Sequence, residues 1–117
     1  MIRLRRVYDP PDLAADGVRV LVDRLWPRGL AKAAARVDEW PKEVTPSAEL
    51  RKWYHAGASW EEFRARYEAE LAAPEAEACL ARLRALAAAG PVTLVTAVRA
   101  PEASHASVLA ELLAGPS

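Results

Sequence analysis

Two short, continuous apolar runs constrain the fold of this chain most strongly. The first occupies residues 18–22 (VRVLV, broken only by Arg19), and the second, at residues 92–98, reads VTLVTAV. A strand that is apolar on both faces needs cover on both faces, which is typical of parallel sheets flanked by helices. We therefore expect one α/β domain over residues 1–117, a small, mostly parallel sheet with helices on both faces. We interpret the first run as its central strand.

The segments around these runs indicate an edge strand and several helices. Residues 2–7 alternate apolar residues with arginines, which predicts a half-buried or edge strand. Residues 30–35 predict one helical turn, and Pro41 makes residues 37–44 an edge strand or an irregular segment.

Capping signals mark where the longer helices begin. Thr45 predicts a helix that starts with a capping hydroxyl and has Pro46 at its first position. Ser59 and Glu62 have the spacing of a capping box. A third helix starts at Pro74 and ends before residues 90–91, and a last one follows residues 101–102.

Polar residues follow the first apolar run at once. Residues 23–29 read DRLWPRG and include Asp23, Arg24, Trp26 and Arg28. In open α/β sheets, ligands bind beyond the carboxyl ends of the strands. Parallel pairing places the ends of both runs at one edge, so we expect these side chains to lie near Arg99, Ser104 and His105.

Three arginines at this edge suggest an anion site. The guanidinium groups of Arg24, Arg28 and Arg99 could hold a phosphate or a carboxylate in bidentate fashion, with Asp23 orienting one of them. The alternative is a structural network in which they pair with Asp23, Glu39 or helix carboxylates.

His105 is the candidate for proton transfer. It falls in the first turn of a predicted helix, where the helix dipole favours the neutral imidazole and so a general base. The alternative is a packed histidine bonded to the preceding loop. Ser104 is either a nucleophile or, several times more often at such a position, the helix cap.

Other candidates lie around the same edge. His55 could line the mouth of the cleft or simply be the polar end of a short helix. Trp26 and Trp40 could stack on a ring, although tryptophan more often packs in the core. Cys79 is the only cysteine, which excludes an intramolecular disulfide, and the sequence has no zinc-ligand spacing, no phosphate loop and no GxSxG motif. We predict no metal site, and the cofactor is undetermined.

Basic and acidic residues are unevenly distributed along the chain. The net charge is zero, yet residues 1–36 are basic and the remainder is acidic. A pI of about 6.7 argues against a dedicated nucleic-acid protein. The basic third nevertheless leaves open a nucleic-acid or protein-binding module, and the two opposite faces would also suit a homodimer.

Targeting patterns and composition bear on location and habitat. No signal-peptide pattern and no apolar run of about 20 residues occurs, so we expect a cytoplasmic protein without membrane contact. The chain lacks Asn and Gln and has 13 arginines to 3 lysines. A thermophilic source and GC-rich codon usage explain this equally well.

The order of these landmarks resembles the YeaO-like family of uncharacterised bacterial proteins, a branch of domain-of-unknown-function family 488. The matching stretches are VRVLVDRLWPRGL, WPKEVTPSAELRKWYH, residues Trp60, Phe63, Tyr67, Glu70 and Leu71, GPVTLVTAVR and HASVLAELL. The resemblance implies an α/β fold and no agreed activity. Positions that match the family pattern are Arg24, Trp26, Pro27, Arg28, Gly29, Pro46, Ser47, Leu50, Arg51, Trp53, His55, Arg99 and His105.

One departure from the family pattern bears on chemistry. The family usually has an acidic residue, a second histidine and an asparagine before the retained histidine, and this chain has Ala100, Ala103 and Ser104 there. A metal site or proton relay built from two histidines would lack one partner. The function that we expect is binding of an anionic, phosphate- or nucleotide-like small molecule, and whether the chain is an enzyme stays open.

Overall fold

The three strands form one parallel sheet in which the third strand lies in the middle. The computed structural model describes residues 2–115. Strands β1 (Ile2–Arg6) and β2 (Val18–Leu21) each pair in parallel with β3 (Val92–Thr96), in the order β1-β3-β2. The predicted parallel α/β fold is confirmed, but the assignment of residues 18–22 to the central strand is wrong. An irregular segment covers this edge, since the amide of Leu21 donates to the carbonyl of Glu39 at 2.9 Å.

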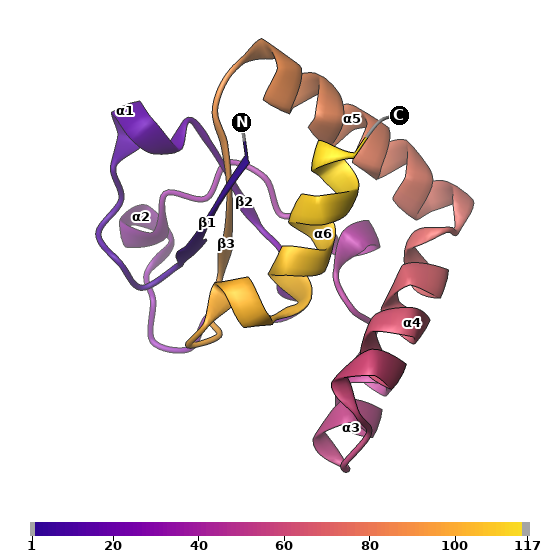
Figure 1. The fold of residues 1–117 in the computed structure, drawn as a ribbon. Coiled ribbons are helices and arrows are strands. Elements are labelled where there is room, and N and C mark those ends of the chain that lie inside the picture. Colours follow the sequence, from indigo (N-terminus) through magenta and orange to yellow (C-terminus); the bar gives the residue numbers. More distant parts are fainter. Residues whose placement is uncertain (1, 116–117) are drawn as a thin grey trace.

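Helices surround the sheet on both sides. In Figure 1, α1 and α2 lie on one side of the strands, α3 to α5 extend on the other, and α6 crosses in front. Among residues 2–115, no helix is both long enough and apolar enough to cross a membrane. The helical elements are α1 (Leu13–Asp16), α2 (Lys32–Ala35), η1 (Lys42–Val44), α3 (Ala48–His55), α4 (Trp60–Leu71), α5 (Pro74–Ala89), η2 (Pro101–Ala103) and α6 (His105–Ala114).

The two faces of the sheet bury cores of different size. Alternation along β3 sends Val92 and Leu94 into the larger core with α4, α5 and α6, and Val95 into the smaller one. The smaller core joins Val95 to Leu21 and to Ala35 of α2. Both faces are therefore covered as predicted, but one of them by little more than a four-residue helix and loops.

Most of the helix-start signals are confirmed. Ser59 and Glu62 form a reciprocal capping box at the start of α4, and Pro74 is the first residue of α5, which Gly90 follows. The predicted start at Thr45 is wrong, because Ser47 caps α3 and accepts from the amide of Leu50 at 3.0 Å. The Thr45 hydroxyl is already engaged, donating to the carbonyl of Lys42 at 2.8 Å across η1.

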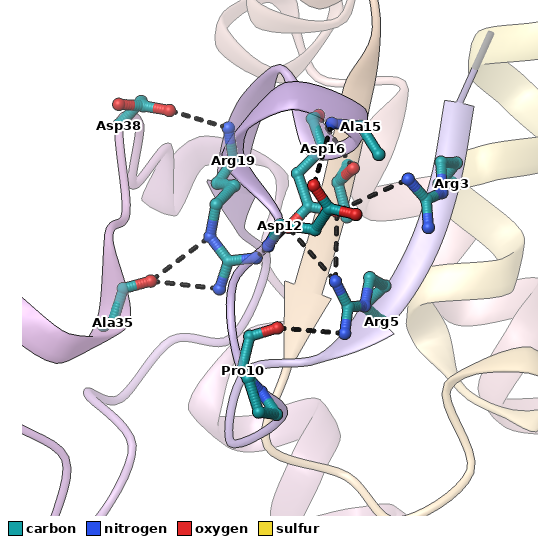
Figure 2. Close-up of polar contacts among 10 residues, drawn as sticks. Arg3, Arg5, Pro10, Asp12, Ala15, Asp16, Arg19, Ala35 and Asp38 are labelled. Carbon is teal, nitrogen blue, oxygen red and sulfur yellow. Dashed lines mark hydrogen bonds and ion pairs between the residues drawn. The ribbon is translucent and has the colours of Figure 1, made fainter.

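A buried carboxylate ties the amino-terminal half of the fold together (Figure 2). The side chain of Asp16 is fully buried and accepts from Arg19 of β2 at 2.6 Å and from Arg5 of β1 at 3.2 Å. Arg19 is 1% exposed and also donates twice to the carbonyl of Ala35. Arg3 adds an ion pair with Asp16 at 3.5 Å. A single carboxylate thus joins β1, α1, β2 and α2.

The next residue, Gly17, makes the turn into β2. Its φ is +61°, and a Cβ atom placed there would lie 2.1 Å from the carbonyl oxygen of Pro91. The amide of Val18 donates to that same oxygen at 3.0 Å. Only glycine allows the two strands to start this close together.

Replacing Asp16 tests this network. Burial raises the pKa of Asp16, but the bonds from the Asp12 amide, Arg19 and Arg5 outweigh it, and the net pKa lies below its ordinary value. Asp16→Asn leaves the buried Arg19 guanidinium without a counter-charge, so we expect unfolding to be easier by roughly 3–5 kcal/mol at pH 7. Urea denaturation measures this change.

Asp9→Asn is the matched control. Asp9 lies in the turn after β1, and its carboxylate has no hydrogen-bond partner among residues 2–115. We expect a change within about 0.5 kcal/mol. Equal effects of the two substitutions would contradict the role assigned to Asp16.

Candidate functional site

A cavity of about 510 Å³ lies at the carboxyl-terminal ends of β2 and β3. Most of its wall comes from three parts of the chain: residues 23–28 after β2, the helices α3 and α4, and the segment after β3 that leads into α6. Tyr8 and Pro46 complete the wall. The site is therefore at the edge of the sheet that the parallel-pair hypothesis indicated.

Asp23 fastens the segment after β2 to the segment after β3. Its Oδ1 lies 2.8 Å from Nε2 of His105, 82 residues along the chain. The same oxygen accepts from the Thr96 hydroxyl at 2.7 Å, and Oδ2 accepts from the amide of Ala97 at 2.8 Å. The predicted proximity of Asp23 and His105 is confirmed.

These bonds decide what Asp23 does. Burial raises its pKa, but the hydrogen bonds from His105, from the amide of Ala97 and from Thr96, with the attraction of the His105 ring when it is protonated, together bring the pKa below its ordinary value. Asp23 is thus a carboxylate that holds a histidine, whereas we had expected it to orient an arginine. With Nε2 donating to Asp23, the remaining ring nitrogen Nδ1 of the neutral imidazole is an acceptor.

The residues next to this pair serve the structure. Ser104 caps α6: its hydroxyl donates to the carbonyl of Pro101 at 2.7 Å and accepts from the amide of Ala106 at 3.2 Å. The ring of Tyr67 packs edge-on against His105, with the ring centres 6.3 Å apart. His105 is therefore held on two sides, and Ser104 has the geometry of a cap.

Arg24 is the one of the three predicted arginines whose guanidinium group bonds to backbone carbonyls. Arg24 is half-buried and donates from Nε to the carbonyl of Pro46 at 3.1 Å, with the carbonyls of Lys42 and Thr45 at 3.5 Å. Arg24 lines the cavity, and its hydrogen bonds also hold the loop after η1 in place.

Arg28 and Arg99 differ from Arg24 in their surroundings. Arg28 lines the cavity and is exposed, and its carbonyl accepts from the hydroxyl of Tyr8 at 2.9 Å. Arg99 is also exposed but is not among the residues that line the cavity. The structure thus brings Arg24 and Arg28 to one cavity and leaves Arg99 outside its walls.

Arg51 is a further cationic side chain on the cavity wall. The resemblance marked it, but we had not placed it in the site. The spacing of Arg51, Tyr54 and His55 puts all three on one face of α3, and this pattern could have revealed it. All three line the cavity, with His55 exposed.

Glu70 of α4 holds the start of α3 in place. Its carboxylate accepts from the amide of Ser47 at 3.0 Å and from the hydroxyl of Ser47 at 2.5 Å. The N-terminus of α3 is therefore clamped to α4, which fixes the helix that carries Arg51.

Aromatic rings form the wall opposite the sheet. The ring centre of Phe63 lies 4.6 Å from that of Tyr54 and 5.5 Å from that of Trp60, and all three line the cavity. Phe63 is also buried in the larger core, and Trp60 packs against that core.

Trp26 and Trp40 mainly pack. Trp26 and Trp40 meet edge-to-face at 5.4 Å, and their indole N–H groups donate to the carbonyls of Leu30 and Asp23 at 2.7 Å. Trp26 also lines the cavity, whereas Trp40 does not.

The site contains no recognisable metal-ligand set. Within residues 2–115, no group of three or more His, Cys, Asp or Glu side chains is placed to hold a metal ion.

Acid titration tests the Asp23 contacts. Because the pKa of Asp23 is lowered by folding, its stabilising contribution is present above the pKa of the unfolded aspartate and is lost as the pH falls through the lowered value. We expect Asp23→Asn to cost roughly 2 kcal/mol at pH 7 and progressively less as the pH falls towards 2. Unfolding free energies over this range measure the trend.

Glu61→Gln, at an exposed position of α4, supplies the comparison. Its unfolding free energy should track that of the parent at every pH. A cost of Asp23→Asn that stayed constant down to pH 2 would contradict the charged contacts.

Comparisons with known proteins identify the family. The family model described as "Inactive DUF488-N3 subclade" matches residues 1–116. An uncharacterized protein of Mycobacterium tuberculosis, Rv3073c, is 50% identical over 115 residues, which cover 97% of this chain and 94% of the relative. The uncharacterized protein YeaO of Escherichia coli K12 is 47% identical over 113 residues, 96% of each chain.

No solved structure matches the chain. The family match and the two relatives confirm the resemblance that the sequence motifs indicated. The chain belongs to the DUF488 family, in its inactive N3 subclade, and is YeaO-like along nearly its whole length.

Proposed function

We propose that the protein binds a small anionic molecule in the cavity at the carboxyl-terminal ends of β2 and β3, and that it binds without catalysing a reaction. The observation that carries the proposal is a surplus of cationic groups in the cavity wall. Arg24, Arg28 and Arg51 line it together with a single carboxylate, Asp23. That carboxylate is already bonded to His105, Thr96 and Ala97.

Two of these arginines are available to a ligand. Among residues 2–115, the guanidinium groups of Arg28 and Arg51 have no hydrogen-bond or ion-pair partner. Guanidinium groups that share a cavity repel one another unless an anion lies between them, and their planar donors suit phosphate or carboxylate oxygens. Arg24 adds positive charge from a fixed position.

Binding without turnover fits the remaining polar groups. The Asp23–His105 pair would suit a general base, but Ser104, the hydroxyl next to it, is used as a helix cap. The family description, an inactive subclade, supports the same view. Ala100 and Ala103 also line the cavity at positions where the wider family was expected to carry polar groups. We place this function in the cytoplasm.

The rival function, a nucleic-acid-binding module using the basic amino-terminal third, has less support. Arg5 and Arg19 are committed to Asp16, and Arg24 to backbone carbonyls. Arg3 is also paired with Asp16, so half of the eight cations of that third stabilise the fold and are not free to follow a phosphate backbone.

Titration with inorganic phosphate and sulfate tests the proposal. We expect both anions to raise the melting temperature and to bind in calorimetry. Arg51→Ala and Arg28→Ala should each weaken binding by roughly 10- to 100-fold, the range for one charge-assisted hydrogen-bonded contact.

Lys52→Ala is the matched control. Lys52 is the residue after Arg51, is exposed, and does not line the cavity. It should bind both anions like the parent. Equal losses from Lys52→Ala and Arg51→Ala would indicate non-specific charge effects and would refute the proposed site.

A further inference from the structure

The cavity is much larger than a bare anion. Its volume is about 510 Å³. A phosphate held by Arg28 and Arg51 would fill a small part of it. Cavities of this size are typical of sites for whole organic ligands. The remaining space must therefore suit a second part of the same molecule.

The wall beside the arginines is aromatic. Tyr54 and Trp60 line the cavity and are half-buried, and their ring centres lie 6.2 Å apart. The ring of Phe63 packs against both of these rings. Such a cluster offers ring surface to a planar group, and stacking tolerates any base because every base has a π face.

The cationic and aromatic groups are close neighbours. Arg51 and Tyr54 are three residues apart on α3, so they lie about 4.5 Å apart along the helix axis and on the same face. Glu70 fixes this helix through Ser47, so the two groups keep a constant relation. The site thus fits a molecule whose anionic and planar parts are separated by a short linker.

We infer that the ligand is a nucleoside monophosphate, with its phosphate at Arg28 and Arg51 and its base against the Tyr54–Trp60 wall. The inference rests on the proposed function and narrows it to one class of anion. A free mononucleotide fits as a whole into a cavity of about 510 Å³, whereas a polymer would have to extend beyond it.

Four probes separate the parts of this ligand: inorganic phosphate, ribose 5-phosphate, adenosine, and adenosine 5′-monophosphate. We expect the monophosphate to bind roughly 5- to 100-fold more tightly than ribose 5-phosphate, the gain expected from stacking one base. Adenosine should bind more weakly than the monophosphate, and Arg51→Ala should reduce that difference.

Trp60→Leu tests the stacking wall. It should lower affinity for adenosine 5′-monophosphate by the same factor and leave ribose 5-phosphate binding unchanged, which also shows that the variant is folded. Trp53→Leu is the control, because Trp53 packs under Arg66 at 4.0 Å and does not line the cavity. If Trp60→Leu fails to fold, Tyr54→Leu takes its place.

The outcomes distinguish the two proposals. Equal affinity of the parent for ribose 5-phosphate and the monophosphate, with both lost in Arg51→Ala, would overturn the nucleotide inference and leave anion binding intact. No binding of any phosphate compound would overturn both. Tighter, strongly salt-dependent binding of single-stranded DNA than of the monophosphate would also overturn the inference, in favour of a polymer.

Discussion

The hydrogen bonding of Asp23 is the interaction on which the site depends. Parallel pairing of β2 with β3 brings the carboxyl ends of the two strands to one edge. This pairing places the backbones and does not fix the side chains that follow them. Asp23 converts that proximity into a fixed arrangement, because its two oxygens together engage Thr96, Ala97 and His105. The loop after β2 and the start of α6 then form two walls of one cavity. Among residues 2–115, no other side-chain hydrogen bond joins residues 23–28 to residues 96–105.

A second carboxylate, the fully buried Asp16, plays the corresponding part at the other end of β2. Asp16 precedes the strand and gathers Arg5 and Arg19, and Asp23 follows the strand and gathers His105. An edge strand of four residues has few ladder bonds of its own, so polar contacts at both ends help to hold it. The same contacts separate the arginines that stabilise the fold from those that are available to a ligand. Those bonded to Asp16 or to backbone carbonyls stabilise the fold, and Arg28 and Arg51 stay available in the cavity wall.

Much of the fold and part of the site could be predicted from residue patterns. The apolar runs at residues 18–22 and 92–98 required a covered parallel pair, and Ser59 with Glu62 required a helix start, since these signals act locally. Strand order was not predictable. The apolar pattern around Val20 is compatible with a neighbouring strand and equally with an irregular segment such as the one at Glu39, which is what the structure has there. The helix start predicted at Thr45 was wrong because its hydroxyl bonds to the carbonyl of Lys42, while Ser47 caps α3 and is held by the tertiary contact with Glu70.

The sequence by itself determined the fold class, the helix starts with a single strong cap, and the edge of the sheet at which polar groups gather. Each of these follows from periodicity, capping or strand direction, which need no knowledge of distant contacts. Tertiary structure alone decided that Asp23 holds His105, that Arg24 bonds to carbonyls, and that Arg51 from α3 reaches the cavity while Arg99 does not line it. The reason is that a guanidinium or carboxylate takes whichever partners folding brings within hydrogen-bond range, and those partners lie up to 82 residues away.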